Sequence, residues 1–290
     1  MEVILGKTAG FCYGVERAVN GCIKTLNEFK NVYCLGEIVH NRQVNSDLKQ
    51  KGIKFIENIE QAPNNSKVII RAHGINKQIY EIAKNKNIEL FDYTCPKVIK
   101  VHNIANKYAN EGYYILLTCS KKNHPEIIGT KSFCGENYAL IENQNDLEEA
   151  LKSIKNNKIK KIVLISQTTF GVKRFKEIQD ILTENLPKEC KFKVENTICY
   201  ATNMRQEETE KISKEVDKMI IVGGKNSSNT QKLFDIALQN CNNSICVETK
   251  DDIKNEDLKN INKIGVMAGA STPKNEINSI IEKYNILGSD

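Results

Sequence analysis

The chain lacks several features that mark particular classes of protein. It has no tryptophan, 5 prolines and no serine- or glycine-rich tract, so long linkers are not expected. No apolar run approaches the roughly 18 residues that a membrane-spanning helix needs. The first residues, Met1-Glu-Val-Ile-Leu-Gly, lack the basic and apolar regions of a secretory signal. We therefore expect a globular cytoplasmic protein without a membrane partner.

The sequence also has little arginine and no nucleic-acid-binding motif. The formal net charge is +6, with 42 Lys and Arg against 36 Asp and Glu. Most of the positive charge comes from lysines that are scattered through helical stretches beside acidic residues, a pattern typical of a solvated surface. No stripe of alternating basic and aromatic residues is present, so we expect no nucleic-acid partner.

Cysteine, by contrast, is abundant, with 10 residues. Disulfides are rare in the cytoplasm, so these cysteines are core residues, metal ligands or catalytic groups. No pair has the C-x-x-C spacing of zinc ribbons and thioredoxins. Cys22 lies on the apolar face of a predicted helix, and Cys34 and Cys246 lie in apolar strands, so we expect these three in the core.

Short apolar runs, each followed by a polar cluster, predict the fold. The runs are residues 32–35, 68–70, 114–117, 162–165, 219–222 and 264–267. Helical patterns follow several of them, and this succession is typical of parallel α/β proteins. Parallel sheets bind ligands at the carboxyl ends of their strands, so the clusters are candidate site residues. They contain His40, His73, His124 with Glu126, Thr168, Ser227 to Asn229, and Ser271.

The clusters come in pairs, and a cysteine precedes each pair. Cys12, Cys95 and Cys199 each follow a strand-like run (residues 3–5, 90–93 and 192–194) and each open a helical pattern. The chain is therefore predicted to contain three similar units of about 100 residues. Each unit contributes one cysteine and two polar strand ends.

Three cysteines at three strand-to-helix junctions suggest a shared metal centre. A helix N-terminus lowers the pKa of a cysteine, and soft thiolates select iron–sulfur clusters, zinc or copper(I). Pro96 follows Cys95, a neighbour also found beside cluster cysteines in ferredoxins. Spacings of 83 and 104 residues match no short metal motif, so three buried structural cysteines remain an alternative.

The remaining clusters favour an anionic ligand and an acid catalyst. Three of the four histidines lie in these clusters, and Ser227, Ser228 and Asn229 precede a helical run whose N-terminus can bind phosphate. These groups suggest a phosphate or diphosphate ligand, although simple helix caps would leave the same pattern. Glu126, beside His124, is a candidate general acid or an ordinary first-turn glutamate.

Taken together, the motifs resemble the 4-hydroxy-3-methylbut-2-enyl diphosphate reductase family, which catalyses the last step of the methylerythritol phosphate route to isoprenoids. The resemblance runs in order through nearly the whole chain. It rests on Gly10-Phe-Cys12, Glu37-Ile-Val-His40-Asn41, Ala72-His73-Gly74, Thr94-Cys95-Pro96, His124-Pro-Glu126, Gln167-Thr168-Thr169, Thr197-Ile-Cys199, Asn226-Ser227-Ser228-Asn229 and Ala270-Ser271-Thr272.

The resemblance implies a cloverleaf of three α/β units with parallel sheets around a central iron–sulfur cluster. The units would be residues 14–95, 96–193 and 194–290, the third joined by the N-terminal strand 1–13. The cluster would be a [4Fe–4S] centre with one open iron, held by Cys12, Cys95 and Cys199. A ferredoxin or flavodoxin would supply the electrons.

The resemblance also implies roles for the polar residues. Glu126 and Thr168, with His124 nearby, would act at the hydroxyl end of (E)-4-hydroxy-3-methylbut-2-enyl diphosphate. The reaction would take two electrons and two protons and yield isopentenyl and dimethylallyl diphosphate. The groups that would hold the diphosphate are His40, His73, Ser227, Ser228, Asn229 and Ser271, with His124 nearby; His124 and Thr168 would also contact the substrate.

Two other classes of function remain open from the sequence. An iron–sulfur dehydratase would remove water without net reduction and would need no external electrons. An iron–sulfur redox sensor would use the cluster but would have no use for Glu126 or an anion site.

Overall fold

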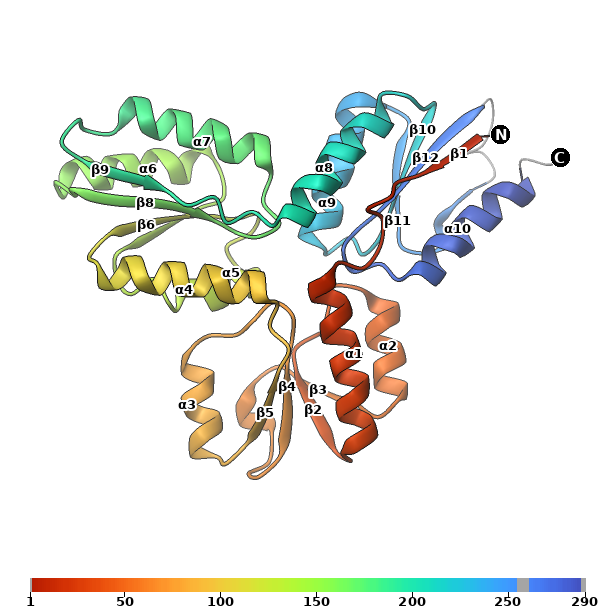
Figure 1. The fold of residues 1–290 in the computed structure, drawn as a ribbon, viewed down its shortest axis with the longest axis horizontal. Coiled ribbons are helices and arrows are strands. Elements are labelled where there is room, and N and C mark those ends of the chain that lie inside the picture. Colours follow the sequence, from red (N-terminus) through yellow and green to blue (C-terminus); the bar gives the residue numbers. More distant parts are fainter. Residues whose placement is uncertain (1, 255–260, 288–290) are drawn as a thin grey trace. The chain divides into compact units, whose positions relative to one another are not determined.

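Three parallel sheets of four strands each form the framework of the chain, as the ribbon shows (Figure 1). The computed structural model describes residues 2–254 and 261–287, with side chains through residue 284. The predicted α/β class is confirmed, and all nine strand-like runs coincide with strands, apart from Tyr93, which lies one residue beyond its strand. No helix in these two described ranges is long and apolar enough to cross a membrane.

The first sheet has the strand order β3-β2-β4-β5 and follows helix α1 (Tyr13–Glu28) in the chain. Its strands are β2 (Val32–Leu35), β3 (Lys54–Ile56), β4 (Lys67–Ile70) and β5 (Glu89–Asp92). The connections contain α2 (Arg42–Gln50), the short 3-10 helix η1 (Ile59–Gln61) and α3 (Gln78–Asn85).

The second sheet repeats this order as β7-β6-β8-β9. Its strands are β6 (Tyr114–Thr118), β7 (Tyr138–Ile141), β8 (Lys161–Ser166) and β9 (Lys191–Val194). Its helices are α4 (Pro96–Asn110), α5 (Pro125–Lys131), α6 (Gln144–Asn156) and α7 (Val172–Asn185).

The third sheet has the order β1-β12-β10-β11, so the first strand of the chain forms its edge. β1 (Glu2–Leu5) pairs with β12 (Lys263–Ala268) in parallel, with Glu2 opposite Lys263. The other elements are α8 (Tyr200–Ser213), β10 (Lys218–Val222), α9 (Ser228–Asn240), β11 (Ser244–Val247), η2 (Lys250–Asp252) and α10 (Lys274–Leu287).

All three sheets therefore share one topology. Two central strands, β2 and β4, β6 and β8, or β10 and β12, are flanked by one edge strand on each side. From each central strand except β12, which the first strand β1 flanks, the chain continues to the edge strand on its own side, so the strand order reverses between the two central strands. The loops that follow these two strands therefore run in opposite directions and leave a crevice for a ligand between them. The polar clusters predicted from the sequence follow these six central strands.

Contacts divide the chain into two compact units. We call Met1–Glu16, Val39–Leu48 and Tyr200–Asp290 the terminal unit, and Arg17–Ile38 and Lys49–Cys199 the middle unit. The middle unit contains the first and second sheets, and the terminal unit contains the third. The three-unit bounds at residues 95 and 193 stay a prediction.

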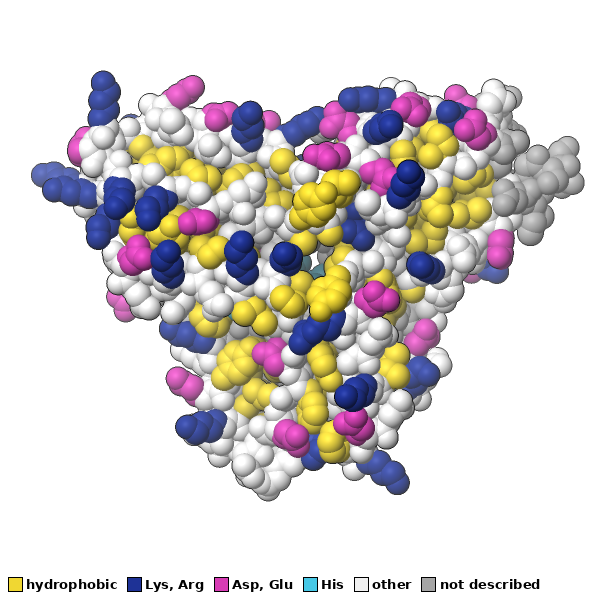
Figure 2. All heavy atoms as spheres, viewed as in Figure 1, with side chains coloured by type: hydrophobic (Ala, Val, Ile, Leu, Met, Phe, Trp, Pro, Cys, Tyr) yellow, Lys and Arg dark blue, Asp and Glu magenta, His cyan; other side chains and the backbone are white. Residues whose placement is uncertain are grey.

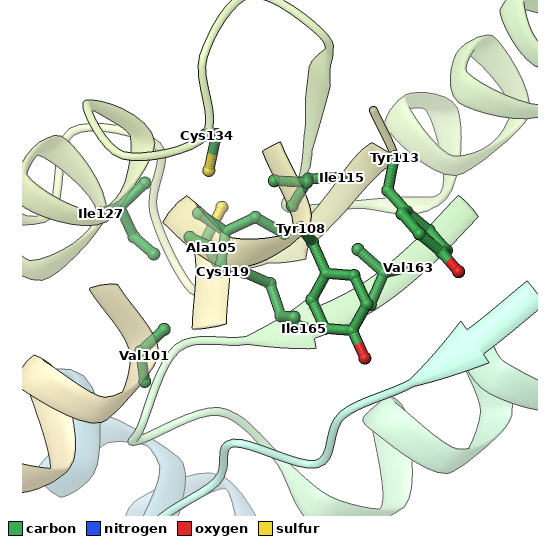
Figure 3. Close-up of a cluster of buried hydrophobic side chains, with 11 residues drawn as sticks. Val101, Ala105, Tyr108, Tyr113, Ile115, Cys119, Ile127, Cys134, Val163 and Ile165 are labelled. Carbon is green, nitrogen blue, oxygen red and sulfur yellow. The ribbon is translucent and has the colours of Figure 1, made fainter. Parts of the chain in front are cut away.

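Helix α4 illustrates how the sequence determines an element. Cys95 occupies its N-cap and Pro96 its first turn, where a missing amide proton costs nothing. Val98, Val101 and Ala105 recur with helical spacing and are buried, and Val101 and Ala105 pack against the second sheet. Val101 and Ala105 belong to the apolar cluster drawn in Figure 3, which also contains side chains of α5, β6 and β8.

The fourth histidine, His102, is a core residue of α4. Its ring stacks on Phe133 with centroids 4.5 Å apart, and it is 6% exposed. Gly74, at φ +73°, lies so close that a Cβ there would be 2.8 Å from the His102 ring. Burial lowers the pKa of His102 from 6.5 to about 4.

We expect His102 to make the folded protein sensitive to acid. Below pH 6.5 the imidazole of His102 takes up a proton in the unfolded state but not in the folded state. The free energy of unfolding therefore decreases as the pH falls from about 6.5 to 4. The maximum loss is roughly 3 kcal/mol. Urea unfolding of wild type and His102→Gln between pH 7 and 4 measures it. Parallel pH profiles for the two proteins would contradict the expectation.

Candidate functional site

The three predicted metal-binding cysteines occupy equivalent places in the three sheets. Each follows an edge strand, is half-buried, and lies directly before a helix. Each backbone amide donates a hydrogen bond to the carbonyl two residues beyond the neighbouring central strand. These bonds are Cys12 N to Ala270 O (3.1 Å), Cys95 N to Ala72 O (2.9 Å) and Cys199 N to Thr168 O (2.9 Å).

The other cysteines differ from these three in burial or position. Burial raises the pKa of Cys22, Cys119 and Cys134 to about 12, so these thiols keep their protons at neutral pH. Cys190 is half-buried, but its Sγ donates to Ile159 O at 3.0 Å. Cys246 lies in strand β11 as predicted, yet it is only half-buried because β11 is an edge strand.

Helix α8 buries a polar face that is not evident from the sequence. Arg205 is 5% exposed, and its guanidinium donates to Gly10 O at 2.7 Å and to Ala201 O at 3.1 Å. It therefore fixes the loop before Cys12 against the first turn of the helix that follows Cys199. The irregular apolar spacing after Cys199 has the same origin, since Thr202, Gln206 and Thr209 are also buried.

Glu126 is a buried carboxyl group held by one residue. Its Oε1 accepts from the backbone amide of Thr168 and its Oε2 from Thr168 Oγ1, both at 2.7 Å. Glu126 is 2% exposed, and burial raises its pKa from 4.5 to about 7 although both hydrogen bonds favour the charged form. The side chain can therefore hold or release a proton near neutral pH.

The predicted neighbour of this carboxyl, His124, lies at the N-cap of α5. Its Nδ1 accepts from Glu126 N at 3.1 Å, so the ring orients the first turn that carries Glu126. His73, which follows β4, meets the His124 ring edge-on with centroids 5.5 Å apart. The loop after β4 is also tied to α5, since Lys77 N donates to Ser132 Oγ at 3.0 Å.

In the terminal unit, the loops after β10 and β12 offer hydrogen-bond donors. Ser227 caps α9 through a bond from Thr230 N at 3.3 Å, which confirms the predicted cap. Asn229 is 4% exposed, and among the side chains the structure describes its Nδ2 has no hydrogen-bond acceptor. A buried amide donor at a helix N-terminus fits an anionic ligand.

The segment with His40 packs against these loops. Ser271 Oγ donates to His40 O at 3.1 Å, and a Cβ on Gly224 would lie 2.7 Å from the same carbonyl. Asn41 caps α2 through a bond from Val44 N and donates to Glu276 at 3.0 Å. Residues more than 200 positions apart in the chain thus fix the backbone beside His40.

Within each unit, the structure brings predicted site residues together. In the middle unit, His73, His124, Glu126 and Thr168 lie each in contact with the next. The backbone amide of Cys199 donates a hydrogen bond to Thr168 O. The terminal unit joins His40 to Ser271 and to the loop that leads to Ser227, Ser228 and Asn229. The ligand and catalytic roles of these residues stay predictions.

Comparisons with known proteins give one consistent result. The family model described as "LytB protein" matches residues 3–285. A curated relative from Caldanaerobacter subterraneus subsp. tengcongensis is 42% identical over 99% of this chain and 98% of its own length. That relative is named 4-hydroxy-3-methylbut-2-enyl diphosphate reductase.

Two solved structures are similar over almost the whole chain. A reductase of E-1-hydroxy-2-methyl-but-2-enyl-4-diphosphate from Plasmodium falciparum is 35% identical, with a TM-score of 0.89 over 97% of this chain and 87% of that chain. A second structure, of (E)-4-hydroxy-3-methyl-but-2-enyl diphosphate reductase, is 36% identical with a TM-score of 0.70. It covers 99% of this chain and 100% of its own.

Proposed function

Because the chain belongs to the LytB protein family, we propose that it reductively removes the hydroxyl group of (E)-4-hydroxy-3-methylbut-2-enyl diphosphate. The reaction takes up two electrons and two protons, breaks the allylic C–O bond and releases water. Its products are isopentenyl and dimethylallyl diphosphate, and we place the reaction in the cytoplasm. The structural observation that carries the proposal is the buried Glu126–Thr168 pair.

A [4Fe–4S] cluster is the cofactor that the cysteine arrangement fits. Cys12, Cys95 and Cys199 are half-buried thiols before helix N-termini, where the field of the helix favours a thiolate. Three protein thiolates would leave one iron open. When bound, such a cluster supplies electrons and Lewis acidity. We propose a ferredoxin or flavodoxin as the electron donor.

Glu126 is proposed as the acid that protonates the departing hydroxyl group. Its pKa of about 7 keeps a substantial protonated fraction at neutral pH, as a general acid requires. Thr168 Oγ1, 2.7 Å from the carboxylate, positions that proton and can pass it on. His124, through its bond to Glu126 N, keeps the carboxyl group in place.

The diphosphate is proposed to bind at the other polar strand ends. The N-terminus of α9 and the buried Nδ2 of Asn229 provide donors for anionic oxygens. Imidazole groups add further hydrogen-bond donors. The proposed anchors are His40, His73, His124, Ser227, Ser228, Asn229 and Ser271.

Removing one imidazole should weaken substrate binding without removing the cofactor. A hydrogen bond to a charged group contributes about 1.5–3 kcal/mol. We therefore expect His40→Ala and His73→Ala each to lower substrate affinity by about 10–150-fold. Calorimetric titration with the substrate measures the loss, with His102→Gln as the histidine control. Unchanged affinity in both variants, or equal loss in the control, would remove the assignment.

Product analysis tests the proposed reaction itself. The reconstituted protein is incubated anaerobically with the substrate and dithionite, and the C5 diphosphates are separated by chromatography. We expect both isopentenyl and dimethylallyl diphosphate to form. Recovery of unchanged substrate from protein with a full cluster would contradict the proposal.

A further inference from the structure

The two compact units differ in charge. The middle unit carries 28 Lys and Arg against 19 Asp and Glu, whereas the terminal unit carries 14 against 17. The positive net charge of the chain therefore belongs to the middle unit. An uneven charge of this kind favours association with an acidic partner and raises the rate of encounter.

Helix α4 concentrates this positive charge. Among the helices that the structure describes, it is the one that carries lysines but no aspartate or glutamate. Lys97, Lys100 and Lys107 are exposed and fall within about 80° of one another around the helix axis. Within the two described ranges, no carboxylate forms an ion pair with any of the three.

Two further lysines extend the positive surface beyond α4. Lys193 Nζ lies over the rings of Tyr108 and Tyr113, 5.1 and 5.3 Å from their centroids, and Lys161 Nζ is 5.7 Å from the Tyr113 centroid. Both tyrosines lie at one end of the buried cluster with their hydroxyl groups pointing out of it (Figure 3). Packing on aromatic rings limits the motion of these lysines and keeps their charge at the surface.

We call the three lysines of α4 and the two beside Tyr108 and Tyr113 the α4 stripe: Lys97, Lys100, Lys107, Lys161 and Lys193. The space-filling view shows basic side chains gathered over the region of α4 and β9 (Figure 2). The stripe begins two residues after Cys95, and Lys100 lies only about 7.5 Å further along the helix axis than that cysteine. A protein bound there therefore sits next to a proposed cluster ligand.

We propose that the α4 stripe is the docking surface for a small acidic protein that carries one electron at a time. This inference rests on the proposed reductive function. Each turnover consumes two electrons, so two reduced donor molecules dock in succession and leave oxidised. One proton leaves with the hydroxyl group as water, and the second forms the new C–H bond of the C5 product. Complementary charge with few apolar contacts suits such a partner, because it must bind quickly and dissociate quickly.

Charge reversal on the stripe tests the proposal. Lys100→Glu/Lys107→Glu places two acidic groups on the stripe but leaves Cys95, Pro96 and the buried face of α4 unchanged. The matched control is Lys152→Glu/Lys155→Glu on α6, in the same unit, where both lysines are also exposed. Steady-state turnover of all three proteins is measured with a reduced ferredoxin or flavodoxin of acidic pI, and separately with dithionite.

We expect the stripe variant to lose about tenfold or more in kcat/KM for the protein donor at low salt. Its turnover with dithionite and its cluster content should equal those of wild type, and its donor rate should no longer fall with added salt. An unchanged donor rate, or an equal loss in the α6 control, would overturn the docking surface. Loss of RNA or anionic-vesicle binding with donor kinetics intact would assign the stripe to that other partner and equally overturn the proposal. Absence of wild-type turnover with dithionite would contradict the proposed function itself.

Discussion

Exchanging Cys12, Cys95 or Cys199 for serine, one at a time, is expected to remove the iron–sulfur cluster and all reductase activity. A serine hydroxyl is a hard ligand that stays protonated, so the three-thiolate site loses one of its bonds. The fold should survive, because the three side chains are half-buried and the backbone bonds of these residues do not involve sulfur. Circular dichroism of the variants should match that of wild type.

The matched control is Cys246→Ser. Cys246 is half-buried like the three predicted ligands but lies within edge strand β11, not before a helix. Iron and sulfide analysis of anaerobically reconstituted protein, with the visible absorbance of the cluster, measures cofactor content. The control should hold a full cluster and the three variants none. Equal cluster content in all four proteins would refute the ligand assignment.

The second large effect is expected for Glu126→Gln. Glutamine has the size of glutamate and can keep both bonds, accepting from Thr168 N and donating to Thr168 Oγ1. The variant should therefore fold and bind substrate. The glutamine amide cannot donate a proton to the substrate near neutral pH. General acid catalysis contributes about 10²–10⁴-fold to the rate, so turnover should fall by about that factor. Single-turnover reduction with excess dithionite measures the loss.

The same substitution should also change the pH dependence. Glu126 acts in its protonated form, and its pKa is about 7, so wild-type kcat/KM should be high below pH 7 and fall about tenfold per pH unit above it. Glu126→Gln should lack this alkaline limb, whereas Thr168→Ser should keep it. Wild-type rates of water loss in the glutamine variant would show that the proton comes from another group.

The sequence predicts much of the fold because the strands are short, apolar and bounded by polar clusters. Parallel strands buried on both faces leave an unbroken apolar run, as at residues 219–222, and the loop that follows carries the ligand-facing groups. The equivalence of Cys12, Cys95 and Cys199 was visible in the same way, since each lies between a strand run and a helical pattern.

Other parts of the site left no periodic signal. Arg205 holds the Gly10 carbonyl from a position 195 residues away, and a buried arginine on a polar helix face has no apolar spacing to detect. Its one sequence signal was rarity, as one of only 5 arginines among 42 basic residues. The bond between Ser271 and the His40 carbonyl likewise spans 231 positions and depends on tertiary packing alone. The pKa of Glu126 depends on burial, which a single glutamate beside a proline does not reveal.

The most direct test of the central claim is the number of electrons consumed for each molecule of substrate that loses its hydroxyl group. The cluster-loaded protein is incubated anaerobically with (E)-4-hydroxy-3-methylbut-2-enyl diphosphate and a limiting, spectrally monitored one-electron reductant. We predict two electrons consumed per C5 diphosphate formed, and no loss of hydroxyl when the reductant is omitted. Water loss at an undiminished rate without any reductant would identify a dehydratase and contradict the reductive function.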